Sequence, residues 1–377
     1  MRQLAIALVV VAAACEGTID PIVPIRVVSD AGVEDPDGGA RDGGTPADAG
    51  HRDGGVIDGG TRDGGHRDGG PQPRRDGGTP TTLQACPTSL GQRIQDLLDE
   101  APGRDSEGYV PLPAAARTPL RTAIAEVLAE DEAALLAVLP DAEYGACRRG
   151  TDAVQLDPAP GTGRALIVIR PRATRAVIVG APHAMYEIDT ATVARAVYDE
   201  VDALALVVSA AHRCANQRAS GCSGETTACS AQSMPYVESD TAHNVVSAFH
   251  LAHEALLDGV ATSTAISLHG KGGNGAVLSN GTMDVTTEDA LVARAVQALQ
   301  AERPADAVLT CNRFPGGQVA GQLCGTTNVQ GRHANGSPMA CTVEAASARD
   351  RFLHLELPLS IRSDPDAVSA TVLRALP

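Results

Sequence analysis

The chain has 377 residues, a formal net charge of −16 at pH 7 and an aromatic content of only 2%. This acidic balance argues against a nucleic-acid partner, because a nucleic-acid surface needs clustered Lys and Arg. The scarcity of aromatic side chains, with no Trp, also argues against the stacking grooves that bind bases or sugars.

The first 15 residues, MRQLAIALVVVAAAC, combine one arginine, a short apolar run and small residues before Cys15. This pattern is typical of an export signal, and the apolar run is too short to span a membrane. The ending resembles a bacterial lipobox, although Ala12 stands where leucine is usual. We therefore expect Cys15 to become a lipid anchor in the cell envelope. An ordinary cleaved signal followed by secretion is the alternative.

Residues 16–84 predict a disordered linker. The triplet DGG occurs seven times at irregular spacing, with few apolar side chains between the repeats. Such a composition cannot bury enough apolar surface to offset the conformational entropy lost on folding. Calcium-binding repeats are the less favoured alternative, because they need fixed spacing and regular apolar positions.

Residues 85–377 are long enough for one large α/β domain. The apolar spacing predicts a single domain with a mostly parallel central sheet flanked by helices, with 212–239 as a long loop. Strands 165–170 and 175–180 are expected to form an adjacent antiparallel pair. The expected helices are 118–139, 190–201, 241–258 and 286–302, and the further strands are 203–210, 264–270, 276–280 and 352–359.

Beyond Cys15 the chain carries eight cysteines, an even number that in an exported protein predicts up to four disulfides. A cysteine-bound zinc is less favoured because no CxxC pair is present. Two polar loops hold three cysteines each. If all eight cysteines form disulfides, at least one cysteine of each loop must therefore pair with a cysteine outside that loop. The residues are Cys86, Cys147, Cys214, Cys222, Cys229, Cys311, Cys324 and Cys341.

Two histidines and one carboxylate stand at the ends of predicted strands. His183 and Glu187 follow the strand 175–180 after a proline, and His269 ends the strand 264–270. Carboxyl ends of parallel strands meet at one edge of a sheet, where ligands bind. Two imidazoles and one carboxylate form the ligand set of an open catalytic zinc site, so Zn²⁺ is the expected cofactor.

The order of these motifs resembles the zinc carboxypeptidase-like superfamily, and most closely its phage-type poly-γ-glutamate hydrolases. N-formylglutamate amidohydrolases are a second similar group. The resemblance implies that His183, Glu187 and His269 bind zinc, and that Glu356 is the general base. The motifs that carry it are Pro182-His183 with Glu187 and Thr190, then His269-Gly270, then Glu356 followed by Arg362.

Glu356 also has a simpler interpretation. It alternates with leucines in FLHLELPL and could face solvent from an exposed side of the strand. His354 shares its face and is either a neighbour of the site or a structural histidine.

Arg213, Arg332 and Asn328 are the predicted substrate-binding residues. A guanidinium grips both oxygens of a carboxylate, which suits a carboxylate-bearing peptide or amide. Ordinary loop arginines remain the alternative.

The segment ESDTAHNVVSAFHLAHE carries a competing set of histidines. Asp240, a plausible helix N-cap, and His243 are expected to line the site mouth. His250 and His253 are expected to be packing or surface residues, with metal binding by these helical histidines as the alternative. No G-x-S-x-G motif supports a serine hydrolase.

The sequence therefore predicts an exported zinc-dependent amide hydrolase of peptide or γ-glutamyl-type bonds. The alternative is a catalytically inactive, surface-anchored binding protein of the same fold.

Overall fold

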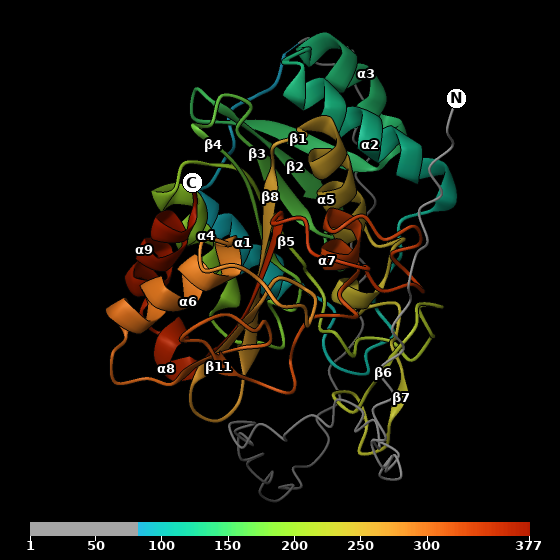
Figure 1. Ribbon diagram of the computed structural model, residues 1–377. Helices are drawn as coiled ribbons and strands as arrows, with labels where there is room; N and C mark the ends of the chain where they lie inside the picture. Colours follow the sequence, from blue (N-terminus) through green and yellow to red (C-terminus); the bar gives the residue numbers. More distant parts are fainter. Residues whose placement is uncertain (1–81) are drawn as a thin grey trace, which may run out of the picture.

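A computed structural model describes residues 82–377 of the chain (Figure 1). Residues 1–81 lie outside the described part, and with them the predicted signal peptide, Cys15 and nearly all of the predicted linker. No helix in residues 82–377 has the length and apolar character needed to cross a membrane.

Within the described residues, ten strands form one sheet in the order β1-β2-β3-β5-β4-β8-β12-β9-β10-β11. Strands β5, β4, β8 and β12 are mutually parallel, as are β9, β10 and β11, and the other neighbours are antiparallel. The bounds are β1 Tyr144–Arg149, β2 Ala153–Pro158, β3 Leu166–Ile169, β4 Arg175–Ala181, β5 Ala203–Val208, β8 Thr264–Lys271, β9 Ala276–Ser279, β10 Val308–Thr310, β11 Gln318–Val319 and β12 Phe352–Pro358, with the separate hairpin β6 Glu225–Thr226 and β7 Met234–Pro235.

Helices cover both faces of this sheet, which makes the fold α/β, as predicted (Figure 1). One apolar core lies between the sheet and α1, α4, α6 and α9, and the other between the sheet and α2, α3 and α5. The bounds are α1 Leu90–Asp99, α2 Ala114–Leu128, α3 Glu132–Ala142, α4 Thr190–Glu200, α5 Ala248–Gly259, α6 Leu291–Glu302, α7 Val329–Ala334, α8 Leu359–Arg362 and α9 Pro365–Ala375.

Three local predictions were wrong. Strands β3 and β4 are not neighbours, because β5 lies between them and pairs antiparallel with β3 and parallel with β4. The long helix expected at 118–139 is two helices, since Asp131 accepts a hydrogen bond from Ala134 and begins α3. The helix expected at 241–258 is a short 3₁₀ turn, Thr241–His243, followed by α5.

The predicted disulfides are present, and all eight cysteines of the described region are paired. Each polar loop has one internal bond, Cys214–Cys229 and Cys311–Cys324. Cys222–Cys341 ties the loop after β5 to the one that follows α7, and Cys86–Cys147 fixes the N-terminal segment to β1. Such bonds are typical of proteins outside the cytoplasm, since thiols in the cytosol are kept reduced.

Candidate metal centre

The first motif forms a single tight turn at the end of β4. Pro182 ends the strand, and the carbonyl of His183 accepts hydrogen bonds from the amides of Tyr186 and Glu187, each at 2.8 Å. This turn brings the side chains four residues apart to one side. The Nδ1 of His183 lies 2.8 Å from Oε1 of Glu187, and both residues are buried. Thr190 completes the motif by donating from its hydroxyl to the carbonyl of Glu187.

His269 reaches the same carboxylate from β8, the strand next to β4 in the sheet. Its Nδ1 lies 3.4 Å from Oε2 of Glu187, and its Nε2 lies 3.1 Å from the Ser267 hydroxyl. The amide of Gly270 donates to the same Glu187 oxygen at 2.9 Å. The sequence-predicted ligands His183, Glu187 and His269 therefore lie together, close enough to hold one metal ion.

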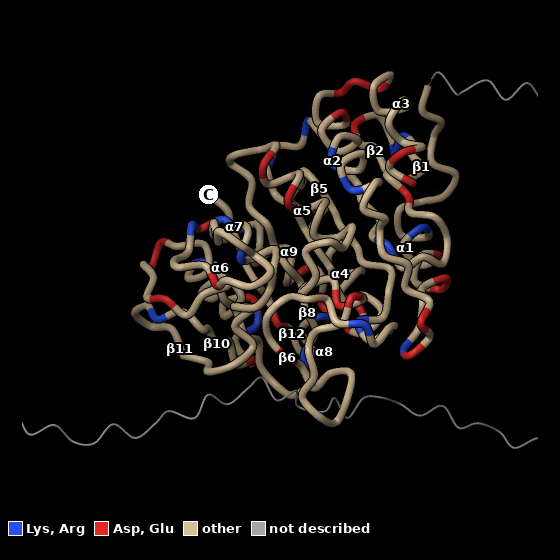
Figure 2. Tube along the Cα trace, turned by 90° about the vertical axis from the view of Figure 1, so that its right-hand side faces the viewer, with Lys and Arg blue, Asp and Glu red and all other residues tan. Residues whose placement is uncertain are grey.

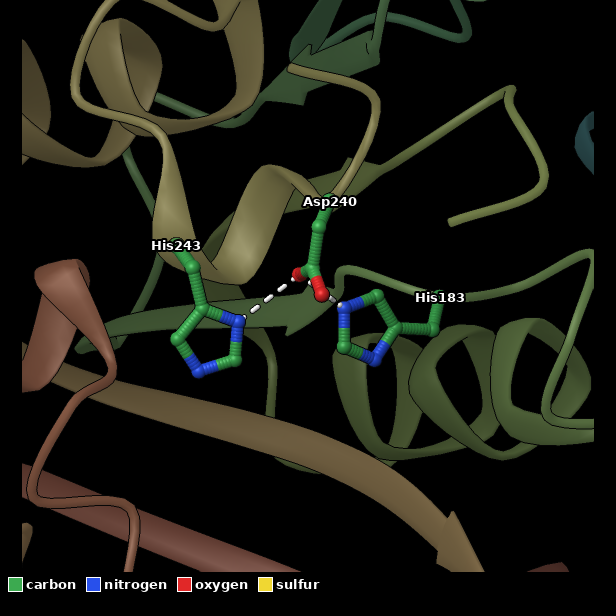
Figure 3. Close-up of side chains that lie close together, drawn as sticks. All are labelled: His183, Asp240 and His243. Carbon is green, nitrogen blue, oxygen red and sulfur yellow. Dashed lines mark hydrogen bonds and ion pairs between the residues drawn. The ribbon is translucent and has the colours of Figure 1, made fainter. Parts of the chain in front are cut away.

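Asp240 supports His183 from the opposite side (Figure 3). This fully buried carboxylate lies between two imidazoles, 2.8 Å from Nε2 of His183 and 2.8 Å from Nδ1 of His243. Its second oxygen accepts two hydrogen bonds from Arg213, at 2.6 and 3.2 Å. The Tyr236 ring stacks on His243 with centroids 3.6 Å apart. Asp240 thus holds the ring of His183 with its Nδ1 toward Glu187.

These contacts shift the pKa values of His183, Glu187, Asp240 and His269. Burial would raise the pKa of Glu187, but His183 and His269 hold it well below the usual range. Burial would also raise the pKa of Asp240, yet Arg213, His243 and His183 keep it well below its usual value. Burial and Arg213 act to lower the pKa of His183, but Glu187 and Asp240 outweigh them and raise it. Burial lowers the pKa of His269 despite Glu187, which favours the neutral imidazole that metal binding needs.

Glu356 lies beside the cluster on β12, directly opposite His269 of β8. It is 8% exposed, so the alternative of an outward-facing strand residue is wrong. Its Oε1 lies 3.6 Å from Nε2 of His354, and these two residues form a second possible metal-binding group with His269. Burial holds the pKa of His354 well below its usual value, which favours the neutral form of its ring. Basic and acidic positions are interspersed around the ends of β8, β12 and α8 (Figure 2).

The predicted substrate-binding residues lie in different surroundings. Arg213 is engaged by Asp240, and its pKa is raised by that carboxylate against the effect of burial. Arg332 is bound to Ser223 and to the carbonyls of Thr326, Ala340 and Cys341, so it holds the disulfide-tied loops together. Asn328 caps α7 through its side-chain oxygen, while its amide nitrogen is buried without a hydrogen-bond partner.

The histidines of helix α5 do not lie with His183, Glu187 and His269. His250 and His253 are buried in α5, with Nδ1 of His253 bound to the Phe249 carbonyl at 2.9 Å. Both therefore pack inside the fold. Asp240 makes no helix-capping hydrogen bond with its side chain.

The sequence indicated Asp240 and His243 only as residues of the site mouth. The direct contact of Asp240 with His183 was missed, because it joins residues 57 positions apart in the chain. The sequence signal that could have indicated this contact is the acidic residue Asp240 directly before the His-containing turn Thr241–His243.

The donor set fits a zinc ion. Two imidazole nitrogens and a carboxylate face one another, and the second nitrogen of each ring is held by Asp240 or Ser267. A carboxylate behind a ligating histidine is the usual support of zinc-bound imidazole.

Comparison with known proteins adds little. No protein-family model matches the chain, and no curated protein matches it. Among solved structures, a protein from Burkholderia mallei that carries a provisional carboxypeptidase name is similar, with a TM-score of 0.31 and 11% identical residues. The alignment covers 56% of this chain and 58% of that one. A similarity this slight supports no conclusion about activity.

Proposed function

We propose that this protein is an exported zinc-dependent hydrolase of amide bonds, of the peptide or γ-glutamyl type. The observation that carries the proposal is the meeting of His183, Glu187 and His269 at the carboxyl ends of β4 and β8, with Glu356 beside them on β12. The four disulfides support a site of action outside the cytoplasm, where Cys15 would anchor the chain to a membrane.

In this proposal His183, Glu187 and His269 would hold the zinc ion. A zinc ion in such a site supplies Lewis acidity, which lowers the pKa of water and polarises a carbonyl group. Asp240 and Arg213 would fix the orientation of His183 through their buried hydrogen bonds.

Glu356 would act as the general base. Its place opposite His269 brings a carboxylate to the side of the cluster, where it would take a proton from the attacking water. The same carboxyl group would then return the proton to the leaving amine. Replacement by Gln keeps the shape of the side chain and removes this proton transfer.

Metal analysis of the purified protein tests the ligand set. We expect about one zinc per chain, and its loss in His269→Ala. The matched control is His250→Ala, which removes a buried histidine outside the cluster and should keep the zinc. Protein purified without chelators that holds no zinc would refute the proposal, and loss of zinc in His250→Ala would move the site to α5.

Hydrolysis assays on α-peptide and γ-glutamyl amides test the base. We expect Glu356→Gln to keep zinc and to lose activity by about 10²-fold or more. Unchanged turnover in this variant would remove Glu356 from the mechanism. A wild-type protein that binds zinc and these compounds without cleaving them would instead be a binding protein.

A further inference from the structure

The disulfide Cys214–Cys229 lies directly beside Arg213, the arginine that binds Asp240. Cys214 follows Arg213 in the chain, and the Sγ atom of Cys229 lies 3.9 Å from the carbonyl oxygen of Arg213. The same carbonyl accepts a hydrogen bond of 2.9 Å from the hydroxyl of Ser239, the residue before Asp240. The disulfide is therefore in contact with the backbone of Arg213, which in turn is bound to the neighbour of Asp240.

Arg213 reaches the candidate metal centre through its guanidinium. It donates two hydrogen bonds to the carboxylate of Asp240, at 2.6 and 3.2 Å. Asp240 in turn lies 2.8 Å from Nε2 of His183 (Figure 3). The Nη1 atom of Arg213 also lies 3.9 Å from Oε1 of Glu187. A displacement of the Arg213 backbone would therefore move groups that contact two of the candidate zinc ligands.

The loop that carries Arg213 has a very small apolar core, and the disulfide supplies most of it. The regular secondary structure of residues 212–239 is limited to the two-residue strands β6 and β7. The buried apolar cluster of this loop consists of Cys214, Cys229 and Val237, so two of its three side chains belong to the disulfide. Opening the bond would remove the constraint on the loop and leave Val237 as the remaining apolar residue of its core.

We propose that the Cys214–Cys229 disulfide is a redox-dependent positioning element of the metal centre, so that full zinc affinity requires this bond. The inference rests on the proposed function, because zinc is the metal whose affinity it concerns. With two thiols in place of the bond, the backbone of Arg213 loses its support, and Asp240 no longer fixes the ring of His183. Loss of the group behind a metal-binding histidine lowers metal affinity by about 10–100-fold. The chain therefore binds zinc weakly under reducing conditions and tightly once the bond has formed outside the cytoplasm.

The coupling acts in both directions. Two molecules of glutathione reduce the bond, and the products are two protein thiols and one molecule of glutathione disulfide. Linkage requires zinc to shift this equilibrium toward the protein disulfide by the same factor by which the disulfide raises zinc affinity. Zinc-loaded protein should therefore keep Cys214–Cys229 intact at glutathione ratios that reduce it in chelated protein.

Competition for zinc with a chromogenic chelator tests the proposal on the full chain. We expect the double variant Cys214→Ser, Cys229→Ser to bind zinc about 10–100-fold more weakly than the wild type. The control is Cys86→Ser, Cys147→Ser, which removes a disulfide at the edge strand β1 with a sequence separation of 61 residues instead of 15. Because the entropic contribution of a disulfide grows with loop length, the control should lose at least as much stability and still keep its zinc affinity. Unchanged zinc affinity in the first variant, or an equal loss in the control, would overturn the inference.

A glutathione redox buffer gives the reciprocal measurement on the wild type alone, so it does not depend on the folding of a variant. After alkylation of the free thiols, mass spectrometry gives the reduced fraction of each disulfide. Zinc should shift the midpoint of Cys214–Cys229 by about 10–100-fold in the glutathione ratio. It should leave the midpoint of Cys86–Cys147 unchanged. Equal shifts of the two bonds would refute a specific link to the metal centre.

Urea unfolding of chelated protein tests the same contact without zinc. Asp240→Asn should lower the urea midpoint of the wild type more than that of the Cys214→Ser, Cys229→Ser variant, since in the variant Arg213 is no longer held against Asp240. Equal shifts in the two backgrounds would refute the coupling. Wild-type protein that holds no zinc would refute the proposed hydrolase, and the urea result would still decide whether the disulfide supports Asp240.

Discussion

Replacing Asp240 by Asn should damage both the fold and the metal centre. Asp240 is fully buried and accepts hydrogen bonds from Arg213, while His183 and His243 lie 2.8 Å from its Oδ1. The substitution removes the negative charge and leaves Arg213 with only Glu187, at 3.9 Å. Breaking one side of a buried ion pair costs about 3–5 kcal/mol. Loss of the group behind a metal-binding histidine lowers metal affinity by about 10–100-fold.

Two measurements check these magnitudes. Urea unfolding of the chelated protein at pH 7 gives the change in the free energy of unfolding, and competition with a chromogenic chelator gives the zinc affinity. Asp258→Asn is the matched control, because Asp258 also pairs with a histidine, His333, but is 65% exposed. An exposed pair contributes about 0–1 kcal/mol, and its loss should leave zinc affinity unchanged.

A double-mutant cycle isolates the contact with Arg213. Arg213→Gln combined with Asp240→Asn removes both charges, so the double variant should be more stable than the sum of the two single effects predicts. If Asp240→Asn stays within about 1 kcal/mol of the wild type and binds zinc with the same affinity, Asp240 does not support His183.

Two further predictions follow from packing and burial. Gly270→Ala should displace the Arg362 guanidinium and lower the free energy of unfolding by about 1–3 kcal/mol, whereas Gly321→Ala, which meets no atom within 4 Å, should leave it unchanged; equal stability of the two variants in urea unfolding would contradict the packing. Burial lowers the pKa of His253 to about 4, so the unfolded chain binds this proton more readily. The stability that His253 contributes should be complete above about pH 6.5 and be lost as the pH falls to about 4, a change of about 3 kcal/mol. Urea titrations of wild type and His253→Gln should therefore converge in this window, and parallel curves would argue against the buried neutral ring.

The sequence predicted where helices and strands lie along the chain better than it predicted the order of the strands in the sheet. Buried β-branched runs and strand-ending motifs placed β4, α4, β5, β8 and β12 within a few residues of their observed bounds. The insertion of β5 between β3 and β4 was not predictable, because two short apolar runs joined by a turn fit a hairpin equally well. That choice depends on non-local pairing, for which local sequence carries no signal.

At the candidate site, too, local sequence signals predicted some features and only the tertiary structure revealed the others. Residue type and strand-end position brought His183, Glu187 and His269 into one hypothesis, since carboxyl ends of neighbouring parallel strands share an edge. Glu356 entered that hypothesis through the family resemblance, and the structure places it opposite His269. Only the tertiary structure showed that Asp240 lies within hydrogen-bonding distance of His183 and accepts a hydrogen bond from Arg213. Only the structure showed, too, that Arg332 holds the disulfide-tied loops together. It also gave the reason for the glycine after His269, which is the guanidinium of Arg362. Charge partners are chosen by distance in the fold, and these distances join residues far apart in the chain.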